Sequence, residues 1–271
     1  MRSINTYPIF KDEWICYNSK ICNVACSLGY INQFSDLDNR IHELVQSFFN
    51  QWQFVIVTYD KLCKLLNTLN ECSDKHDSVA NFSEYDIKSA DSEVDFKNHT
   101  YLLIVSIKTY LDLFACLVDI IQVQEIKEEW KLPDFYNIGN NKKENIDSEI
   151  ILEFNKLRDQ NIYPWIALVK SIRDKIIHRG YQLKPNFGLR KSEELTIRAY
   201  KGTDFYVSAI NIEIGKLFHE FMSDMPEIEE RISNILIRKV DTLNSKLSLT
   251  VSFRSDGWIN EYKYEEIEPQ G

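Results

Sequence analysis

The sequence predicts a mainly α-helical protein: an antiparallel bundle of four or five helices with one or two peripheral β-hairpins. Apolar residues recur at helical spacing along several long stretches, and only 8 Gly and 6 Pro interrupt the 271 residues. A composition that is 44% hydrophobic and 27% charged is typical of an ordered globular chain. At this length the fold can bury roughly three quarters of the surface that the unfolded chain exposes, so we expect a substantial core.

Two long helices are expected in the first half of the chain. Residues 1–34 show no clear apolar period and are assigned to an N-terminal cap of unknown structure. The first helix should begin at Ser35, which offers an N-cap oxygen ahead of two first-turn carboxylates, and run to about Leu69. Residues 71–93 are rich in Ser, Asp and Glu and predict a long acidic loop. The second helix is expected over about 95–129.

Two shorter helices follow in the prediction. One is expected from Asp147 to Arg158. The next should begin at Pro164, which suits the first turn of a helix, and should end before Gly180, which suits a left-handed C-terminal cap. Apolar residues of this helix recur at helical spacing: Trp165, Leu168, Ile172 and Ile176.

The last third of the chain combines a long helix with two hairpins. The helix is expected over about 212–243, with a bend at Pro226. Short strand-like segments beside turn-forming residues predict a hairpin before this helix and another after it. The four strands are expected over residues 195–200, 205–210, 247–253 and 258–264. The predicted organisation is therefore the N-terminal cap, a helical bundle over 35–243, and a C-terminal hairpin and tail over 247–271.

The most apolar stretch, residues 101–123, approaches the length of a membrane-spanning helix. It carries Lys108, Asp112 and Asp119, which are four and seven residues apart and therefore share one helical face. Such a polar stripe is typical of a buried helix and not of one that faces lipid. We therefore expect a soluble protein with no membrane partner.

The cysteine pattern favours a reducing compartment. No CxxC pair occurs, and no His stands at zinc-finger spacing, so neither a metal site nor any other cofactor is expected. The first residues lack the apolar run of a secretory signal, so we expect a cytoplasmic protein whose thiols are reduced core side chains. A redox or metal role is the alternative for these residues: Cys16, Cys22, Cys26, Cys63, Cys72 and Cys116.

Charge is distributed unevenly along the chain. The net charge of −9 opposes nonspecific binding to a polyanion, so a nucleic-acid site must be local. Residues 170–191, called the basic segment below, hold seven basic residues and one acidic residue, a net charge of +6. A phosphate-bearing ligand needs such a segment. The alternative is a solvated helix end whose bases complement the helix dipole.

Within the basic segment, three residues are suited to acid–base chemistry on a phosphodiester. Asp174 precedes His178 by four residues, so both lie on one helical face, and Asp174 is expected to orient the imidazole. The carboxylate and the helix C-terminus both favour the imidazolium, so we expect His178 to titrate near neutral pH. Arg173 is five residues before His178 and about 140° away around the helix, from where its long side chain can bend toward a shared cleft.

These residues resemble a known signature. The pattern is an Arg, a polar residue, three to five further residues and a His near the end of a bundle helix. It is the signature of HEPN domains, which are α-helical, usually dimeric, and in many cases metal-independent endoribonucleases of toxin–antitoxin, CRISPR-associated and phage-defence systems. The matching run is Ser171-Ile172-Arg173-Asp174-Lys175-Ile176-Ile177-His178-Arg179-Gly180.

The resemblance implies a mechanism and a set of partners. Two protomers would place Arg173 and His178 from each chain along one groove, and the RNA would be cut to a 2′,3′-cyclic phosphate without metal. A homodimer is implied, and a regulatory or antitoxin protein is a candidate partner. In one HEPN toxin group a Tyr two residues after the His is modified, but Gly180 occupies that position here and Tyr181 follows it. The residues expected to hold the RNA backbone are Lys170, Lys175, Arg179 and Lys184.

A second hypothesis treats the same bundle as a catalytically inactive module. Arg173 and His178 would then serve packing or RNA binding, and the acidic residues 71–93 would be a candidate contact with another protein. Exposure discriminates between the two hypotheses. Exposure of both Arg173 and His178 in one cleft favours the enzyme, whereas burial of His178 against Trp165 favours the module.

Overall fold

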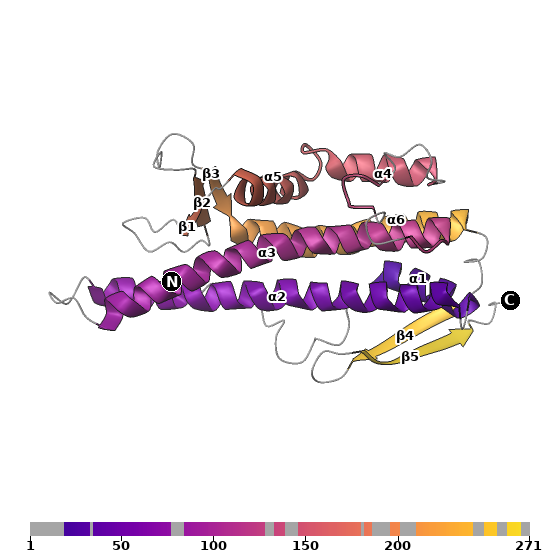
Figure 1. Cartoon of the computed structure of the whole chain (residues 1–271), viewed down its shortest axis with the longest axis horizontal. Coiled ribbons are helices and arrows are strands. Elements are labelled where there is room, and N and C mark those ends of the chain that lie inside the picture. The colour runs from indigo at the N-terminus through magenta and orange to yellow at the C-terminus, as the bar shows by residue number, and fades with distance from the viewer. Residues whose placement is uncertain are drawn as a thin grey trace. The chain divides into compact units, whose positions relative to one another are not determined.

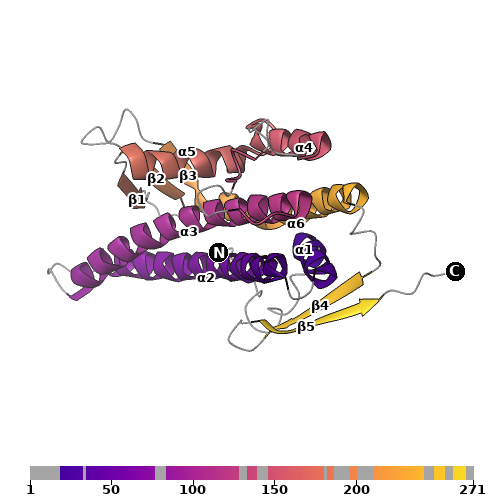
Figure 2. The same ribbon diagram turned by 45° about the vertical axis from the view of Figure 1, so that its right-hand side comes forward.

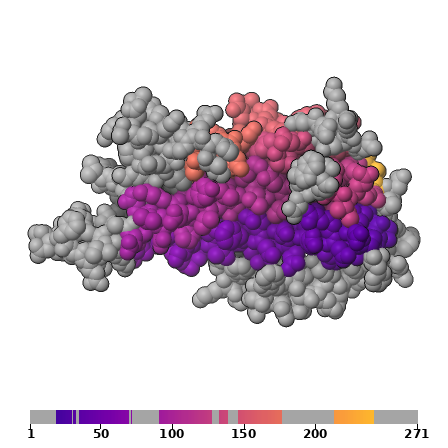
Figure 3. Space-filling model, viewed as in Figure 1, coloured from indigo at the N-terminus to yellow at the C-terminus, as the bar shows by residue number. Residues whose placement is uncertain are grey.

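The structure is a computed structural model, and most of the residues that it describes are helical, which confirms the expected mainly α class. The described residues are 19–32, 35–76, 84–127, 133–138, 146–179, 182–185, 196–200, 210–240, 247–253 and 259–266. The helices are α1 (Lys20–Ile31), α2 (Asp36–His76), α3 (Glu84–Val123), α4 (Ser148–Arg158), α5 (Pro164–Arg179) and α6 (Ile214–Lys239) (Figure 1). The strands are β1 (Gln182–Pro185), β2 (Thr196–Tyr200), β3 (Ile210–Glu213), β4 (Leu247–Phe253) and β5 (Ile259–Glu266). Figure 3 colours the residues whose side chains are also described.

The chain forms two compact units, and each is built from separate stretches of sequence. The first contains the described parts of residues 54–108 and 167–221. The second contains the described parts of residues 7–53, 109–166 and 222–271. Helices α2, α3, α5 and α6 each contribute residues to both units.

A buried carboxylate joins three helices of the second unit. Glu229 of α6 is only 1% exposed. Its Oε1 accepts a hydrogen bond from the Tyr110 hydroxyl of α3 at 2.5 Å, and its Oε2 accepts one from Ser19 Oγ at 2.6 Å. Ser19 is the N-cap of α1 and also accepts from the Cys22 backbone N–H at 3.4 Å. Burial of a carboxylate requires such donors, because the group loses its hydration.

Aromatic rings fill the space around this carboxylate and beneath α4. The Phe48 ring of α2 lies 4.2 Å from the Tyr110 ring, measured between centroids. The Phe154 ring of α4 lies 5.9 Å from Phe114 and 5.4 Å from Phe135. All five side chains are fully buried. Ring pairs of this kind add about 1 kcal/mol each beyond their burial.

Side chains on one face of α3 bind the segment that follows the helix. Asp112 Oδ1 accepts from the Phe135 backbone N–H at 3.0 Å, and Cys116 Sγ donates to the Pro133 carbonyl at 3.3 Å. Asp119, which is 2% exposed, pairs with Lys127 at 2.7 Å. These residues recur every three or four positions, so one face of α3 positions the returning chain.

Helix α3 also contains residues 101–123, the most apolar stretch of the sequence. By length and composition residues 91–123 could cross a membrane, and 61% of the most apolar window within them is buried in the protein. Such burial is what the core helix of a soluble protein shows. Among the described cysteines, Cys22, Cys26 and Cys116 are buried and Cys63 is partly buried, and none of the four forms a disulfide. Burial raises the pKa of Cys22 well above its ordinary value, with a smaller contribution from Glu229, and raises that of Cys116 to about 12, helped by Asp112.

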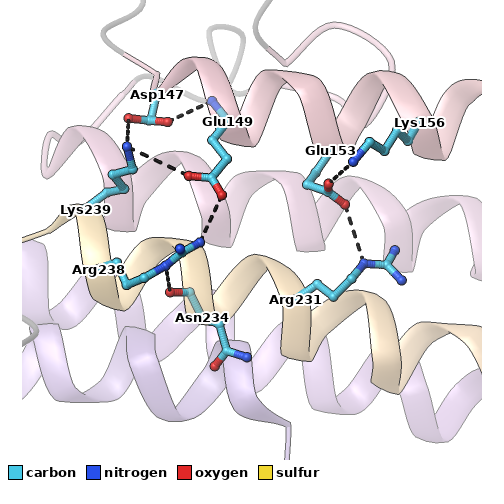
Figure 4. A network of polar contacts seen from close by, with 8 residues as sticks. All are labelled: Asp147, Glu149, Glu153, Lys156, Arg231, Asn234, Arg238 and Lys239. Carbon is cyan, nitrogen blue, oxygen red and sulfur yellow. Dashed lines mark hydrogen bonds and ion pairs between the residues drawn. The ribbon is translucent and has the colours of Figure 1, made fainter.

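Helix α4 is joined to α6 by ion pairs, and its apolar face is buried. Its buried face consists of Ile150, Phe154 and Leu157. On the other side Arg238 pairs with Glu149 at 2.9 Å and Arg231 with Glu153 at 3.4 Å. Such partly exposed pairs contribute less than about 1 kcal/mol each, so they orient α4 more than they stabilise it. The network comprises Asp147, Glu149, Glu153, Lys156, Arg231, Asn234, Arg238 and Lys239 (Figure 4).

In the first unit, α2 and α6 meet through stacked rings. The Tyr59 and Phe218 rings are parallel to within 5° at a centroid distance of 3.7 Å. Gly215 lies next to the Tyr59 hydroxyl, and an added Cβ there would be 3.7 Å from that oxygen, an ordinary contact. Buried residues of α3 and α5, including Phe96 and Val169, complete the core of this unit.

Both sheets are antiparallel. In the first unit, the order is β1-β2-β3. In the second unit, β4 pairs with β5, with a register shift between Ser252 and Phe253, and β4 lies beside α1 (Figure 2).

Several predicted helix boundaries are wrong. Helix α1 lies within residues 1–34, where no element was expected, and Ser19 caps it. Residues 71–76 and 84–93, part of the predicted acidic loop, are helical, because a helix propagates through polar residues once apolar segments have nucleated it. Helix α3 ends at Val123 and not near 129, because Gln124 adopts a positive φ of 56° and closes the last turn through a hydrogen bond from its N–H to Ile120.

The strands also differ from the prediction. Strand β1 was not expected, and β3 occupies 210–213, whereas residues 205–209 of the predicted strand lie outside the described residues. Short strands have a weak sequence signal, because cross-strand pairing decides them more than local propensity does. Helix α6 spans Ile214–Lys239 and contains Pro226, within the predicted range of 212–243.

We predict that Glu229→Ala lowers the free energy of unfolding by about 3 kcal/mol or more, because the Ser19 and Tyr110 hydroxyls each lose a buried acceptor. Tyr110→Phe should lower it by about 1 kcal/mol, since one donor is lost. Urea unfolding followed by circular dichroism measures both. The matched control is Glu230→Ala, because this neighbouring residue pairs with Lys20 and is half exposed. Equal losses in the two Glu variants would contradict the role of Glu229.

Candidate active site

The candidate site is carried by helix α5. Pro164 is its first residue, where the missing N–H does no harm. Trp165, Val169 and Ile172 are buried and recur at intervals of four and three residues. Leu168 and Ile176, which the sequence placed on this apolar face, are partly exposed. The helix therefore has one buried stripe, and most of the described side chains on its other faces are partly exposed.

Three polar contacts in the second unit hold the start of α5. The Trp165 indole Nε1–H donates to Asp224 Oδ2 of α6 at 2.8 Å. Arg231 of α6 donates from Nη2 to the Tyr163 hydroxyl at 2.7 Å, just before the helix begins. The Tyr136 hydroxyl donates to the Ile166 carbonyl at 2.9 Å. Several bonds thus fix the first turn of α5 within this unit.

Arg173 and Asp174 lie together on the partly exposed side of α5. Arg173 Nη1 donates to Asp174 Oδ1 at 3.1 Å, and their side chains are 36% and 40% exposed. An ion pair with this exposure contributes less than about 1 kcal/mol, so a phosphate group can displace the carboxylate at low cost. Asp174 is therefore a partner of Arg173, which the sequence did not predict.

Of the other predicted site residues, only two have described side chains. Lys170 is exposed and Lys175 is partly exposed. His178 and Arg179 belong to the last turn of α5, but their side chains lie outside the described residues, as does that of Lys184 in β1. The expected contact between Asp174 and His178 is likewise outside the description.

The helical backbone fixes how the positions of the motif relate. Positions 170, 174 and 178 follow one another at intervals of four residues, so they share one side of α5. Position 173 is about 7.5 Å along the axis from position 178. The last turn exposes helix carbonyls, whose partial negative charge favours cations there. Among the described residues, no group of three His, Cys, Asp or Glu side chains could hold a metal ion.

Two features of the structure were not found from the sequence. Glu229 falls among the buried residues Met225, Ile228 and Ile232, so its position on the apolar face of α6 was the available signal. Arg198 of β2 is the register partner of Lys184 in β1, and pairing of strands this short has no reliable sequence signal.

No protein-family model, curated protein or solved structure matches the chain.

We predict that Asp224→Ala lowers the free energy of unfolding by about 1–2 kcal/mol, because the buried Trp165 N–H loses its acceptor. Glu227→Ala is the control, since this exposed residue lies on the same helix. A double-mutant cycle with Trp165→Phe should show coupling of about 1 kcal/mol. If the losses of unfolding free energy in the two single variants, measured in urea, simply add in the double variant, the hydrogen bond between Trp165 and Asp224 does not hold α5.

Proposed function

We propose that the protein is a metal-independent endoribonuclease that cuts RNA by attack of a ribose 2′-hydroxyl on the adjacent phosphate. The observation that carries the proposal is the placement of Arg173, partly exposed on α5, five residues before His178 in the last turn of the same helix. The basic segment, with its net charge of +6, surrounds this pair in the sequence. The resemblance of these residues to the HEPN signature supports the same reaction.

The chemistry needs one base, one acid and charge stabilisation. His178 takes the proton of the 2′-hydroxyl, whose oxygen forms a bond to phosphorus while the bond to the 5′-oxygen breaks. The leaving 5′-oxygen takes a proton from an imidazolium, and the products are a 2′,3′-cyclic phosphate and a 5′-hydroxyl. Arg173 exchanges Asp174 for the nonbridging oxygens, where negative charge builds up.

The proposal extends to the setting of the enzyme. It describes a cytoplasmic toxin or phage-defence effector, built as an antiparallel bundle of four or five helices, that needs no cofactor and is controlled by a regulatory or antitoxin protein. Lys170, Lys175, Arg179 and Lys184 hold the RNA backbone. Phosphate contacts of this kind carry no sequence information, so the enzyme has weak sequence preference.

We predict that His178→Ala and Arg173→Ala each reduce RNA cleavage in EDTA by about 10²-fold or more, because both groups act on the transition state. Asp174→Ala should reduce the rate less, since this residue transfers no proton. The measurement is gel analysis of a labelled single-stranded RNA, with the 2′,3′-cyclic end identified by mass spectrometry.

His99→Ala is the control for these variants, because the His99 ring bonds only locally, to the Asp95 carbonyl, in the contacts described. Full activity in either motif variant, or activity that disappears in EDTA and returns with magnesium, would refute the mechanism. RNA binding without cleavage by the unmodified protein would identify it as the inactive module.

We also predict a homodimer, because a separate acid and base are needed and one protomer supplies a single motif His. Most apolar side chains of residues 101–123, including Leu103, Ile107 and Leu111, are buried within the protomer, which limits the apolar surface that this helix offers to an interface. The exposed side of α5 is therefore proposed to face the second copy. Light scattering should give twice the mass of the chain at micromolar concentration, and an active monomer would contradict this.

A further inference from the structure

The three-stranded sheet of the first unit has two chemically different faces. Successive residues of a strand alternate between faces, and register partners share a face. One face holds only apolar positions: Leu183, Pro185, Ile197, Ala199, Ile210 and Ile212. The other holds Gln182, Lys184, Thr196, Arg198, Tyr200, Asn211 and Glu213. Alternation this complete is typical of an antiparallel sheet with one face on the core and one in water.

The centre of the polar face is basic. Lys184 of β1 is the register partner of Arg198 of β2, which in turn is the partner of Asn211 of β3. Like charges at directly opposed positions repel each other. A ligand with negative charge converts that repulsion into attraction.

The neighbouring positions narrow the class of ligand. Tyr200 is the register partner of Gln182, and this pair is next to the Lys184 and Arg198 pair on the same face. An aromatic residue beside two bases and two amides is the combination that binds single-stranded nucleic acid, in which bases stack on rings and cations track the backbone. Glu213 is the one acidic residue among the positions of this face, and it stands at the end of the sheet, opposite Thr196.

The sheet follows α5, the helix that carries Arg173 and His178, closely in the sequence. Helix α5 ends at Arg179 and β1 begins at Gln182, three residues later, so the chain between them spans at most about 10 Å. Residues 167–179 of α5 and all of β1 belong to the first unit. An RNA strand whose scissile phosphate lies at the end of α5 can therefore continue over the sheet.

We infer that the polar face of β1-β2-β3 binds the phosphate backbone of the RNA strand on one side of the cleavage site, with Lys184 and Arg198 as its phosphate contacts. This inference rests on the proposed function and assigns to Arg198, Tyr200 and Asn211 a role that the motif does not provide. The sheet sets affinity, whereas Arg173 and His178 set the rate of cleavage.

The test measures binding separately from cleavage. Fluorescence anisotropy with a labelled single-stranded RNA gives the dissociation constant in the His178→Ala background, where the RNA stays intact. Lys184→Ala and Arg198→Gln should each weaken binding roughly three- to tenfold and lower the slope of log affinity against log salt by about 0.7. Arg198→Lys keeps the charge and should keep the slope.

Lys216→Ala is the matched control, because this exposed lysine belongs to the same unit but lies outside the sheet, in α6. It should leave binding unchanged, and all variants should share one unfolding midpoint. Unchanged affinity and slope in the Lys184 and Arg198 variants would refute the sheet surface while leaving the nuclease standing. Weakened binding in those variants of a protein that never cuts RNA would support the sheet and refute the nuclease. RNA that is neither bound nor cut would refute both.

Discussion

The second unit depends on the burial of one carboxylate. Glu229 satisfies its two oxygens with donors from different parts of the chain: the N-cap Ser19 of α1 and Tyr110 of α3. A buried carboxylate without such donors is strongly destabilising, so α1, α3 and α6 must reach their places together. The N-cap of α1 is thereby linked to a residue 210 positions away, and α1, which has no clear apolar period in the sequence, becomes part of the core.

Helix α6, which carries Glu229, also contacts the start of α5, the helix of the candidate site. Beyond Glu229 it supplies Asp224 and Arg231, which hold the first turn of α5 and the residue before it, and it supplies the bases that orient α4. The motif residues follow within two to four turns of that anchored start. A site of this kind needs its first residues on a rigid element, because small displacements of catalytic groups reduce rates strongly.

Local rules predicted part of the fold and part of the site. Asp147 caps α4 and Pro164 opens α5 because capping and proline geometry act within a few residues, and helical spacing identified the buried stripe that leaves Arg173 on a partly exposed side. The rest depends on distant contacts. Ser19 and Glu229 meet only in the folded chain, polar residues near 84 are helical because the apolar part of α3 extends into them, and the pairing of Lys184 with Arg198 is decided by strand register.

The carboxylates of α3 also matter before the protein is folded. While the chain is being synthesised, the most apolar helix is complete before Lys127, Pro133 and Phe135, which contact its Asp119, Cys116 and Asp112, have emerged from the ribosome. At that moment the nascent helix resembles a substrate of the membrane-insertion machinery. Asp112 stands at the midpoint of residues 101–123, where one aspartate opposes insertion by roughly 3 kcal/mol. The residues that later hold the returning segment thus also direct the unfinished chain away from the bilayer.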